Sequence, residues 1–254
     1  MSKALEKRVN TEFNIGDRTG NTGLDRMREV TSFMPDSGVD FTVIHVAGTN
    51  GKGSVANFIY EALRNAGESV GISSDLVSIK NYNHNIRVNG ECITDSEYLR
   101  IARGIMRGVD VTPSEYELRV AVAIAYFIEQ DVTYGVIEAG IGGKFDATNV
   151  LGDDVSVITT VGRDHADELG DDRESIAERK AEIIDPGSKV VSRVSGEPKR
   201  VISRVTESVG GEEVTSIADM SFFRRDDRVT FDVVYAGKRT SSQLVAGYQT
   251  ENVE

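Results

Sequence analysis

Apolar and polar residues along this chain form two alternating patterns. The predicted strands are short, apolar, β-rich runs at residues 41–46, 69–73, 133–138, 155–161 and 189–194. The predicted helices have apolar residues at helical spacing and cover about residues 54–66, 94–106, 114–128 and 173–184. Strands that alternate with helices indicate an α/β fold, in which a mostly parallel sheet is covered by helices on both faces.

The alternation stops after about residue 210. Residues 228–235 and 239–245 have β-rich patterns, and a turn at Ala236-Gly237-Lys238 separates them. This arrangement predicts a small antiparallel hairpin, so we expect a β appendage at about residues 211–246.

Composition narrows the class of protein. The 254 residues include 29 Lys and Arg against 41 Asp and Glu, which gives a net charge of −12, and Cys92 is the single cysteine. A disulfide framework is therefore excluded. The longest apolar run, Val120–Ile128, is too short to cross a bilayer, and the N-terminus lacks the apolar segment of a signal peptide. An acidic chain without a basic block is a poor fit to nucleic acid. We expect a cytoplasmic globular protein with neither a nucleic-acid nor a membrane partner.

A glycine-rich stretch between the first predicted strand and its helix suggests phosphate binding. It reads Gly48-Thr49-Asn50-Gly51-Lys52-Gly53-Ser54. Glycines let backbone N–H groups turn inward around an anion, the following helix adds its positive N-terminus, and Lys52 adds a mobile charge. The strict P-loop pattern would have Gly in place of Val46 and a hydroxyl residue in place of Gly53. The plain alternative is a glycine-rich turn with a surface lysine.

A second glycine-rich run follows a strand that ends in a carboxylate. Glu138 ends the predicted strand, and the run 139–149 after it contains Gly140, Gly142 and Gly143. In P-loop proteins an acid at a strand end holds the Mg²⁺ that bridges the phosphates. Phe145 stands where a dinucleotide fingerprint would have its last glycine, which disfavours a dinucleotide site.

The three histidines have different settings. His45 lies inside an apolar strand and is interpreted as a core residue, and His84 lies in a polar stretch and is interpreted as solvated. His165 follows the carboxyl end of a predicted strand, where open α/β sheets bind ligands, so we expect it to contact a ligand or metal.

Together these residues resemble the folylpolyglutamate synthase/dihydrofolate synthase family, a branch of the Mur ligase group of ATP-dependent amide-forming enzymes. Five ordered motifs carry the resemblance: Gly23–Met27, Ile44–Ser54, Glu138–Asn149, Asp164-His165 with Leu169-Gly170, and Ile176–Ile184. The resemblance implies a P-loop-type α/β domain like the Mur ligase central domain, with ATP and Mg²⁺ as cofactors.

Site roles carry over position by position. The resemblance implies ATP binding by Gly48, Thr49, Asn50, Gly51, Lys52, Gly53, Ser54 and Asn149. It implies Mg²⁺ coordination by Ser74, Glu138, His165 and, if carbamoylated, Lys180. The catalytic residues would be Lys52, His165 and Lys180, and the substrate contacts Tyr116, Glu117 and Asp146. An ordinary salt-bridging helix residue is the alternative for Lys180.

Three departures from the family pattern bear on the substrate. Ser74-Asp75-Leu76 stands where relatives have Ser-Pro-His, and the stretch 80–85 lacks the family's Glu-Arg pair. Lys144 replaces an arginine, which keeps the charge but loses bidentate geometry.

The resemblance also divides the chain. We expect a helical lead-in at 1–40, an ATP-binding domain at 41–246, and the start of a hinge at 247–254. Gly247–Asn252 resembles the element that introduces a C-terminal domain in relatives, and the sequence stops at Glu254. That domain is therefore expected to be absent from this chain or supplied elsewhere.

The leading functional hypothesis is an ATP-dependent ligase that joins glutamate to a folate or dihydropteroate carboxylate through an acyl phosphate. Two alternatives stay open: a nucleotide-binding module that needs a further domain or partner, and a Mur-type amide ligase for a non-folate acid.

Overall fold

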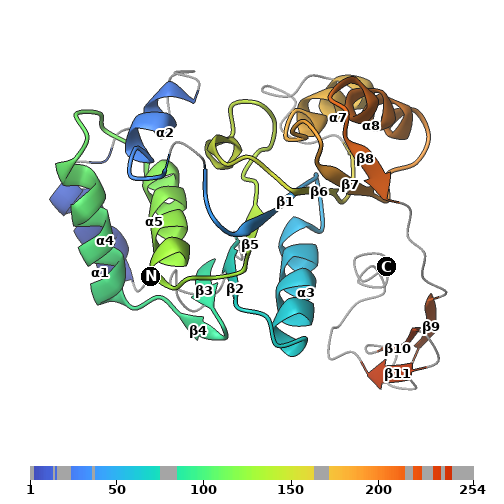
Figure 1. Cartoon of the computed structure of the whole chain (residues 1–254), viewed down its shortest axis with the longest axis horizontal. Coiled ribbons are helices and arrows are strands. Elements are labelled where there is room, and N and C mark those ends of the chain that lie inside the picture. Colours follow the sequence, from blue (N-terminus) through green and yellow to red (C-terminus); the bar gives the residue numbers. More distant parts are fainter. Residues whose placement is uncertain are drawn as a thin grey trace.

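The computed structural model describes residues 3–13, 15, 24–35, 38–74, 85–162, 172–214, 220–224, 231–235 and 238–241. The described helices are α1 (Lys3–Phe13), α2 (Asp25–Val30), α3 (Lys52–Asn65), α4 (Asp95–Arg107), α5 (Glu115–Glu129), the short 3₁₀ helix η2 (Ala147–Val150), α7 (Arg173–Ala181) and α8 (Glu197–Ser208). The described strands are β1 (Thr42–Ala47), β2 (Val70–Ser73), β3 (Ile86–Val88), β4 (Glu91–Cys92), β5 (Tyr134–Glu138), β6 (Val155–Ile158), β7 (Lys189–Ser192), β8 (Glu212–Val214), β9 (Met220–Arg224), β10 (Phe231–Tyr235) and β11 (Lys238–Ser241). Figure 1 shows their arrangement.

The large sheet has eight strands in the order β4-β3-β2-β5-β1-β6-β7-β8. The six strands from β2 to β8 pair in parallel, and β3 and β4 add an antiparallel edge beside β2. This confirms the predicted α/β class with a mostly parallel sheet. The large sheet continues through β8, so the antiparallel part starts beyond residue 211, where we expected the appendage to begin.

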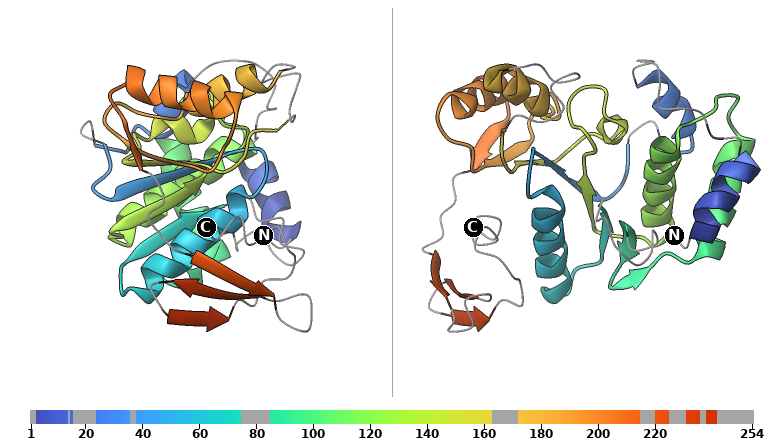
Figure 2. Two further views of the ribbon diagram at one scale, coloured as in Figure 1. Left: turned by 90° about the vertical axis from the view of Figure 1, so that its right-hand side faces the viewer. Right: turned by 180° about the vertical axis from the view of Figure 1, so that it is seen from behind.

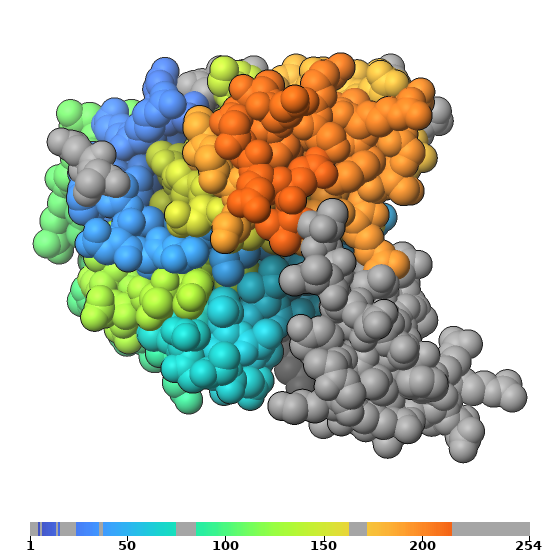
Figure 3. All heavy atoms as spheres, turned by 45° about the vertical axis from the view of Figure 1, so that its right-hand side comes forward, coloured from blue at the N-terminus to red at the C-terminus, as the bar shows by residue number. Residues whose placement is uncertain are grey.

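Alternating side chains of β1 divide the core between the two faces of the sheet. Ile44 and Val46 pack on the face covered by α3, whereas Val43 and Ala47 point to the other face. On that other face Val43 joins the cluster that includes α5, and Ala47 joins the cluster of α7 and α8. Figures 1 and 2 show α3 and α5 on opposite sides of the strands, and Figure 3 shows the outer surface of α3 in cyan.

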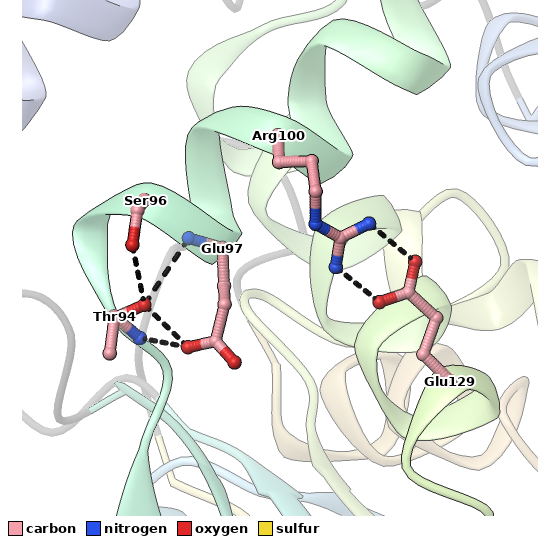
Figure 4. Close-up of polar contacts among 5 residues, drawn as sticks. All are labelled: Thr94, Ser96, Glu97, Arg100 and Glu129. Carbon is pink, nitrogen blue, oxygen red and sulfur yellow. Dashed lines mark hydrogen bonds and ion pairs between the residues drawn. The ribbon is translucent and has the colours of Figure 1, made fainter.

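The predicted helix start at residue 94 is confirmed in atomic detail. Thr94 accepts from the backbone N–H of Glu97, whose side chain accepts from the N–H of Thr94, which is a complete capping box at the start of α4. One turn later Arg100 forms a two-bond ion pair with Glu129 at the end of α5 (Figure 4). Both side chains are largely exposed, so this pair contributes little stability.

A separate three-stranded antiparallel sheet has the order β11-β10-β9. Its β10–β11 hairpin pairs Tyr235 with Lys238 and Asp232 with Ser241, which confirms the predicted hairpin with shorter strands. Among the described residues, no helix combines the length and apolar character that a membrane span requires.

Candidate nucleotide site

Four chain segments leave the sheet at one edge. β5 ends at Glu138, which pairs with Val46 near the end of β1, and Ala47 pairs with Ile158 at the end of β6. Ser73, the last residue of β2, pairs with Ile137. Parallel strands end at the same edge, so Ser74, Glu138, Gly48 and Thr159 all start from the carboxyl edge, where open α/β sheets bind ligands.

The predicted phosphate loop joins β1 to α3. Gly51 is the N-cap of α3 with φ 84°, a left-handed conformation that suits glycine. Val55 N–H donates to the carbonyl of Gly51, so the helix begins at once. The N–H groups of the first helical turn have no acceptor within the helix, and Gly51 offers no side-chain cap, so this end fits an anion.

Two other amides of the loop are already engaged. The N–H of Thr49 donates to the carbonyl of Thr160 at 2.8 Å, and the N–H of Asn50 donates to the hydroxyl of Thr160 at 2.9 Å. The amides that suit phosphate oxygens are therefore those of residues 51–54 rather than the whole predicted loop. Lys52 Nζ donates to the carbonyls of Gly48, at 3.0 Å, and Thr49, at 3.4 Å.

Asp146, a predicted substrate residue, is buried and organises the glycine-rich loop. Its Oδ2 accepts from the N–H groups of Ile141 and Gly142, both at 2.9 Å. Its Oδ1 accepts from the N–H and the hydroxyl of Thr148 and from the hydroxyl of Tyr116 at 3.1 Å. Burial by itself would raise the pKa of Asp146, but the hydrogen bonds from Thr148 and Gly142 outweigh it and lower the pKa.

His45 adds a buried link between β1 and the same loop. Its Nε2 lies 2.8 Å from the hydroxyl of Thr148. Because that hydroxyl donates to Asp146, it accepts from His45, so Nε2 carries the hydrogen. Burial lowers the pKa of His45, and its Nδ1 has no hydrogen-bond partner among the described residues. The core position expected from the sequence is confirmed, although only one of the two ring nitrogens has a hydrogen-bond partner among the described residues.

The other two predicted substrate residues lie on α5. Tyr116 contacts the glycine-rich loop closely, because a Cβ on Gly140 would lie 2.7 Å from its hydroxyl oxygen. The carboxylate of Glu117 caps α5 by accepting from the N–H of Ser114 at 2.7 Å, and it accepts from Arg26 Nε. Both side chains thus make structural contacts within the fold.

Lys180 and Asn149 connect α7 to the glycine-rich loop. The side chain of Lys180 is buried, and its Nζ donates to the carbonyl of Ile141 at 3.4 Å. The side-chain amide of Asn149 donates to the carbonyls of Lys144 and Glu182 at 3.4 and 3.5 Å. Lys180 therefore reaches the loop that begins at Glu138.

The predicted metal ligands are described only in part. Glu138 and Ser74 are buried at the carboxyl edge, whereas Asp164 and His165 lie outside the described residues. Within the described ranges no three His, Cys, Asp or Glu residues form a metal-binding group. Glu138 supplies one carboxylate of the kind that Mg²⁺ prefers, so it fits as part of a metal site.

Sequence reasoning missed the residues that hold these loops. The apolar pattern extended the strand to Val161, but β6 ends at Ile158 because Thr159 and Thr160 turn to the phosphate loop. The sequence does contain a signal for these contacts, because Thr159 and Thr160 are two hydroxyl residues directly after the strand. Thr148, which joins His45 to Asp146, was also missed.

The fold and this edge define a P-loop-type α/β domain, and comparison with known proteins gives the family. The Mur ligase middle domain family matches residues 46–193, so the chain belongs to that family. The chain is 38% identical over 181 residues to the dihydrofolate synthase/folylpolyglutamate synthase of Bacillus subtilis (strain 168), a match that covers 68% of this chain and 42% of the relative.

Solved structures of FPGS and FolC are also similar to this chain. An FPGS–AMPPCP–folate complex superposes with a TM-score of 0.84 at 29% identity, covering 97% of this chain and 64% of the other. E. coli FolC in complex with DHPP and ADP gives a TM-score of 0.79 at 26% identity, covering 98% of this chain and 60% of the other. The chain thus spans about two fifths of the length of the Bacillus relative and under two thirds of these structures.

Proposed function

We propose that this chain is the ATP-binding part of a ligase that joins glutamate to a folate or dihydropteroate carboxylate. The observation that carries the proposal is the phosphate loop at the start of α3, beside Glu138 at the carboxyl edge of the sheet. The similarity to dihydrofolate synthase/folylpolyglutamate synthases supports the choice of reaction. In our proposal residues 1–40 are a lead-in, 41–246 form the ATP-binding domain and 247–254 begin a hinge.

The reaction must bring together two anions, the triphosphate and a carboxylate. The carboxylate oxygen would attack the terminal phosphorus, ADP would leave, and the glutamate amine would then displace phosphate from the acyl phosphate to form the amide. The amides of residues 51–54 and Lys52 would hold the phosphates, so catalysis would come from positioning and charge stabilisation. On binding, Nζ of Lys52 would exchange the carbonyls of Gly48 and Thr49 for phosphate oxygens.

Mg²⁺ would neutralise charge between the phosphates and the acceptor carboxylate. In the proposal Glu138, His165 and Ser74 hold one ion. Lys180, if carbamoylated, would offer oxygen ligands to a second, because the modification replaces its ammonium with a carboxylate-like group. Tyr116, Glu117 and Asp146 would shape the substrate side through the glycine-rich loop and α5.

ADP binding and ADP release test different parts of this proposal. Calorimetric titration of the chain with ADP should show binding, and Lys52→Ala should weaken it at least about tenfold, since a charged hydrogen bond to phosphate contributes about 1.5–3 kcal/mol. Lys7→Ala, on the exposed side of α1, is the matched control and should bind like the wild type. Absence of nucleotide binding by the folded wild-type chain would refute the proposal.

A second candidate is a nucleotide-binding module that turns over only with a further domain. The 42% coverage of the Bacillus relative favours it. ADP release with dihydropteroate or tetrahydrofolate plus glutamate separates the two: robust turnover by this chain alone refutes the module. If other acceptor acids support release and these two do not, the acceptor is a non-folate acid.

A further inference from the structure

The residues that follow β6 form an extended contact with the phosphate loop. We call Thr159–Gly162 the brace segment. The hydroxyl of Thr159 donates to the carbonyl of Asn50 at 2.7 Å, and the hydroxyl of Thr160 donates to the same carbonyl at 3.1 Å while accepting from the N–H of Asn50. Two neighbouring threonines therefore satisfy both backbone groups of one loop residue.

The brace segment also engages Thr49. Its N–H donates to the carbonyl of Thr160, its hydroxyl lies 3.2 Å from the carbonyl of Gly162, and that hydroxyl lies 3.0 Å from the N–H of Gly162. Contacts of both backbone and side chain therefore fix the first half of the loop.

The close approach of Thr159 depends on a glycine. A Cβ on Gly48 would lie 2.0 Å from the hydroxyl oxygen of Thr159, and the φ of Gly48 is 148°. Any larger side chain there would push away the hydroxyl that reaches Asn50. Thr159 can therefore lie this close to the phosphate loop only because residue 48 is a glycine.

We propose that Thr159 and Thr160 are positioning residues for the nucleotide, acting through the Asn50 peptide group. This inference rests on the proposed function, because it assigns the brace a role in binding phosphate. The bonds engage the N–H groups of residues 49 and 50 and leave the N–H groups of residues 51–54 for the ligand. A loop that is ordered before binding loses less conformational freedom when the nucleotide arrives, so affinity is higher.

Two substitutions of Thr160 separate shape from hydrogen bonding. Thr160→Val keeps the shape but removes the bonds to the N–H and the carbonyl of Asn50, whereas Thr160→Ser keeps the hydroxyl. With calorimetric titration of ADP, we expect Kd to rise about ten- to a hundredfold in the valine variant, as for the loss of one or two hydrogen bonds, and to stay within about threefold in the serine variant. Thr206→Val is the control, since that hydroxyl bonds within α8, and it should leave Kd unchanged.

The outcomes distinguish this inference from the function on which it rests. If the folded wild type does not bind ADP, the proposed function fails and the brace has no ligand to position. If the wild type binds and a folded Thr160→Val variant binds equally well, the brace proposal is overturned while the proposed function stands. Should Thr160→Val unfold, Thr159→Val removes the other hydroxyl bond to Asn50, together with a longer one to the carbonyl of Ala47 at 3.3 Å. Wild-type affinity in that variant also overturns the proposal.

Discussion

Nε of Arg26 on α2 lies 2.9 Å from Oε2 of Glu117 on α5, a residue 91 positions further along the chain. The same carboxylate accepts from the N–H of Ser114 and completes the capping box of α5. Glu117 is buried, so its charge is compensated by Arg26 and by the helix start rather than by water. One carboxylate thus joins the lead-in to the helix that supports the glycine-rich loop.

Replacing Glu117 with Ala should destabilise the protein by about 2–4 kcal/mol, because it removes a helix cap and leaves Arg26 without its partner. Chemical unfolding measures this change. Arg28→Ala on α2, the helix that carries Arg26, is the control: its ion pair with Asp25 is exposed, so the loss should stay under about 1 kcal/mol. Equal losses in the two variants would contradict a structural role for the buried pair.

The sequence predicted the parallel sheet and the phosphate loop because their signals are local. Apolar runs of strand length, capping residues and a glycine-rich turn before a helix are each read within a few positions. The same reasoning missed α8, β8 and the short strands β3 and β4. α8 is mostly polar, and β3, β4 and β8 have only two or three residues each, so their pairing depends on the strands already in place.

The role of the candidate site residues was harder to predict. Asp146 and Glu117 stand at positions where the family resemblance implies substrate contact, but single-sequence patterns do not show which hydrogen bonds a carboxylate makes. Thr148, Thr159 and Arg26 act on residues about 90 to 110 positions away, and no local pattern encodes such pairs. Only the folded backbone brings them together.

Asp153, which is buried, and Asp185, which is half-buried, make an acidic pair near the amino ends of β6 and β7, away from the phosphate loop. Each carboxylate accepts from the other residue's N–H, at 2.9 and 3.0 Å. Burial, with the nearby negative charge of Asp185, raises the pKa of Asp153 to about 7, although a hydrogen bond from Ser156 acts against the rise. The folded state therefore favours the protonated form of Asp153.

Stability should therefore fall as the pH rises through about 7, because the unfolded state releases the Asp153 proton at a much lower pH. Asp153→Asn mimics the protonated acid and should raise the Tm at pH 8 by a few degrees, with little effect near pH 4. Thermal unfolding from pH 4 to pH 8 measures this. A pH-independent effect of Asp153→Asn would contradict the raised pKa.

The buried His45 should remain neutral with its hydrogen on Nε2 throughout the physiological pH range. Burial lowers its pKa, and the hydroxyl of Thr148 fixes the tautomer. Nitrogen chemical shifts of the imidazole in a ¹⁵N-labelled sample measure both properties between pH 5.5 and 8. In Thr148→Val the Nε2 hydrogen loses its acceptor, so the shifts should change, whereas Thr148→Ser should keep them. An imidazole that titrates near its ordinary pKa of about 6.5 would show that His45 is not held in this way.

Two glycine-to-alanine substitutions should have opposite effects on stability. Gly143 has a φ of 91°, and a Cβ there would lie 2.9 Å from the backbone carbonyl oxygen of Arg179 on α7. Gly143→Ala should therefore lower the free energy of unfolding by about 1–3 kcal/mol, because it combines backbone strain with a clash against a rigid atom. Gly104 lies inside α4 on an exposed surface, and a Cβ there meets nothing within 4 Å.

Gly104→Ala should instead raise the free energy of unfolding by about 0.5–1 kcal/mol, the difference in helix propensity between the two residues. Urea unfolding of both variants, with the wild type alongside, gives the two values on one scale. If Gly143→Ala is as stable as the wild type, the glycine-rich loop and α7 are not packed as closely as this contact requires. ADP titration of the same two proteins then separates stability from binding: Gly104→Ala should bind like the wild type, whereas a displaced loop in Gly143→Ala should weaken binding.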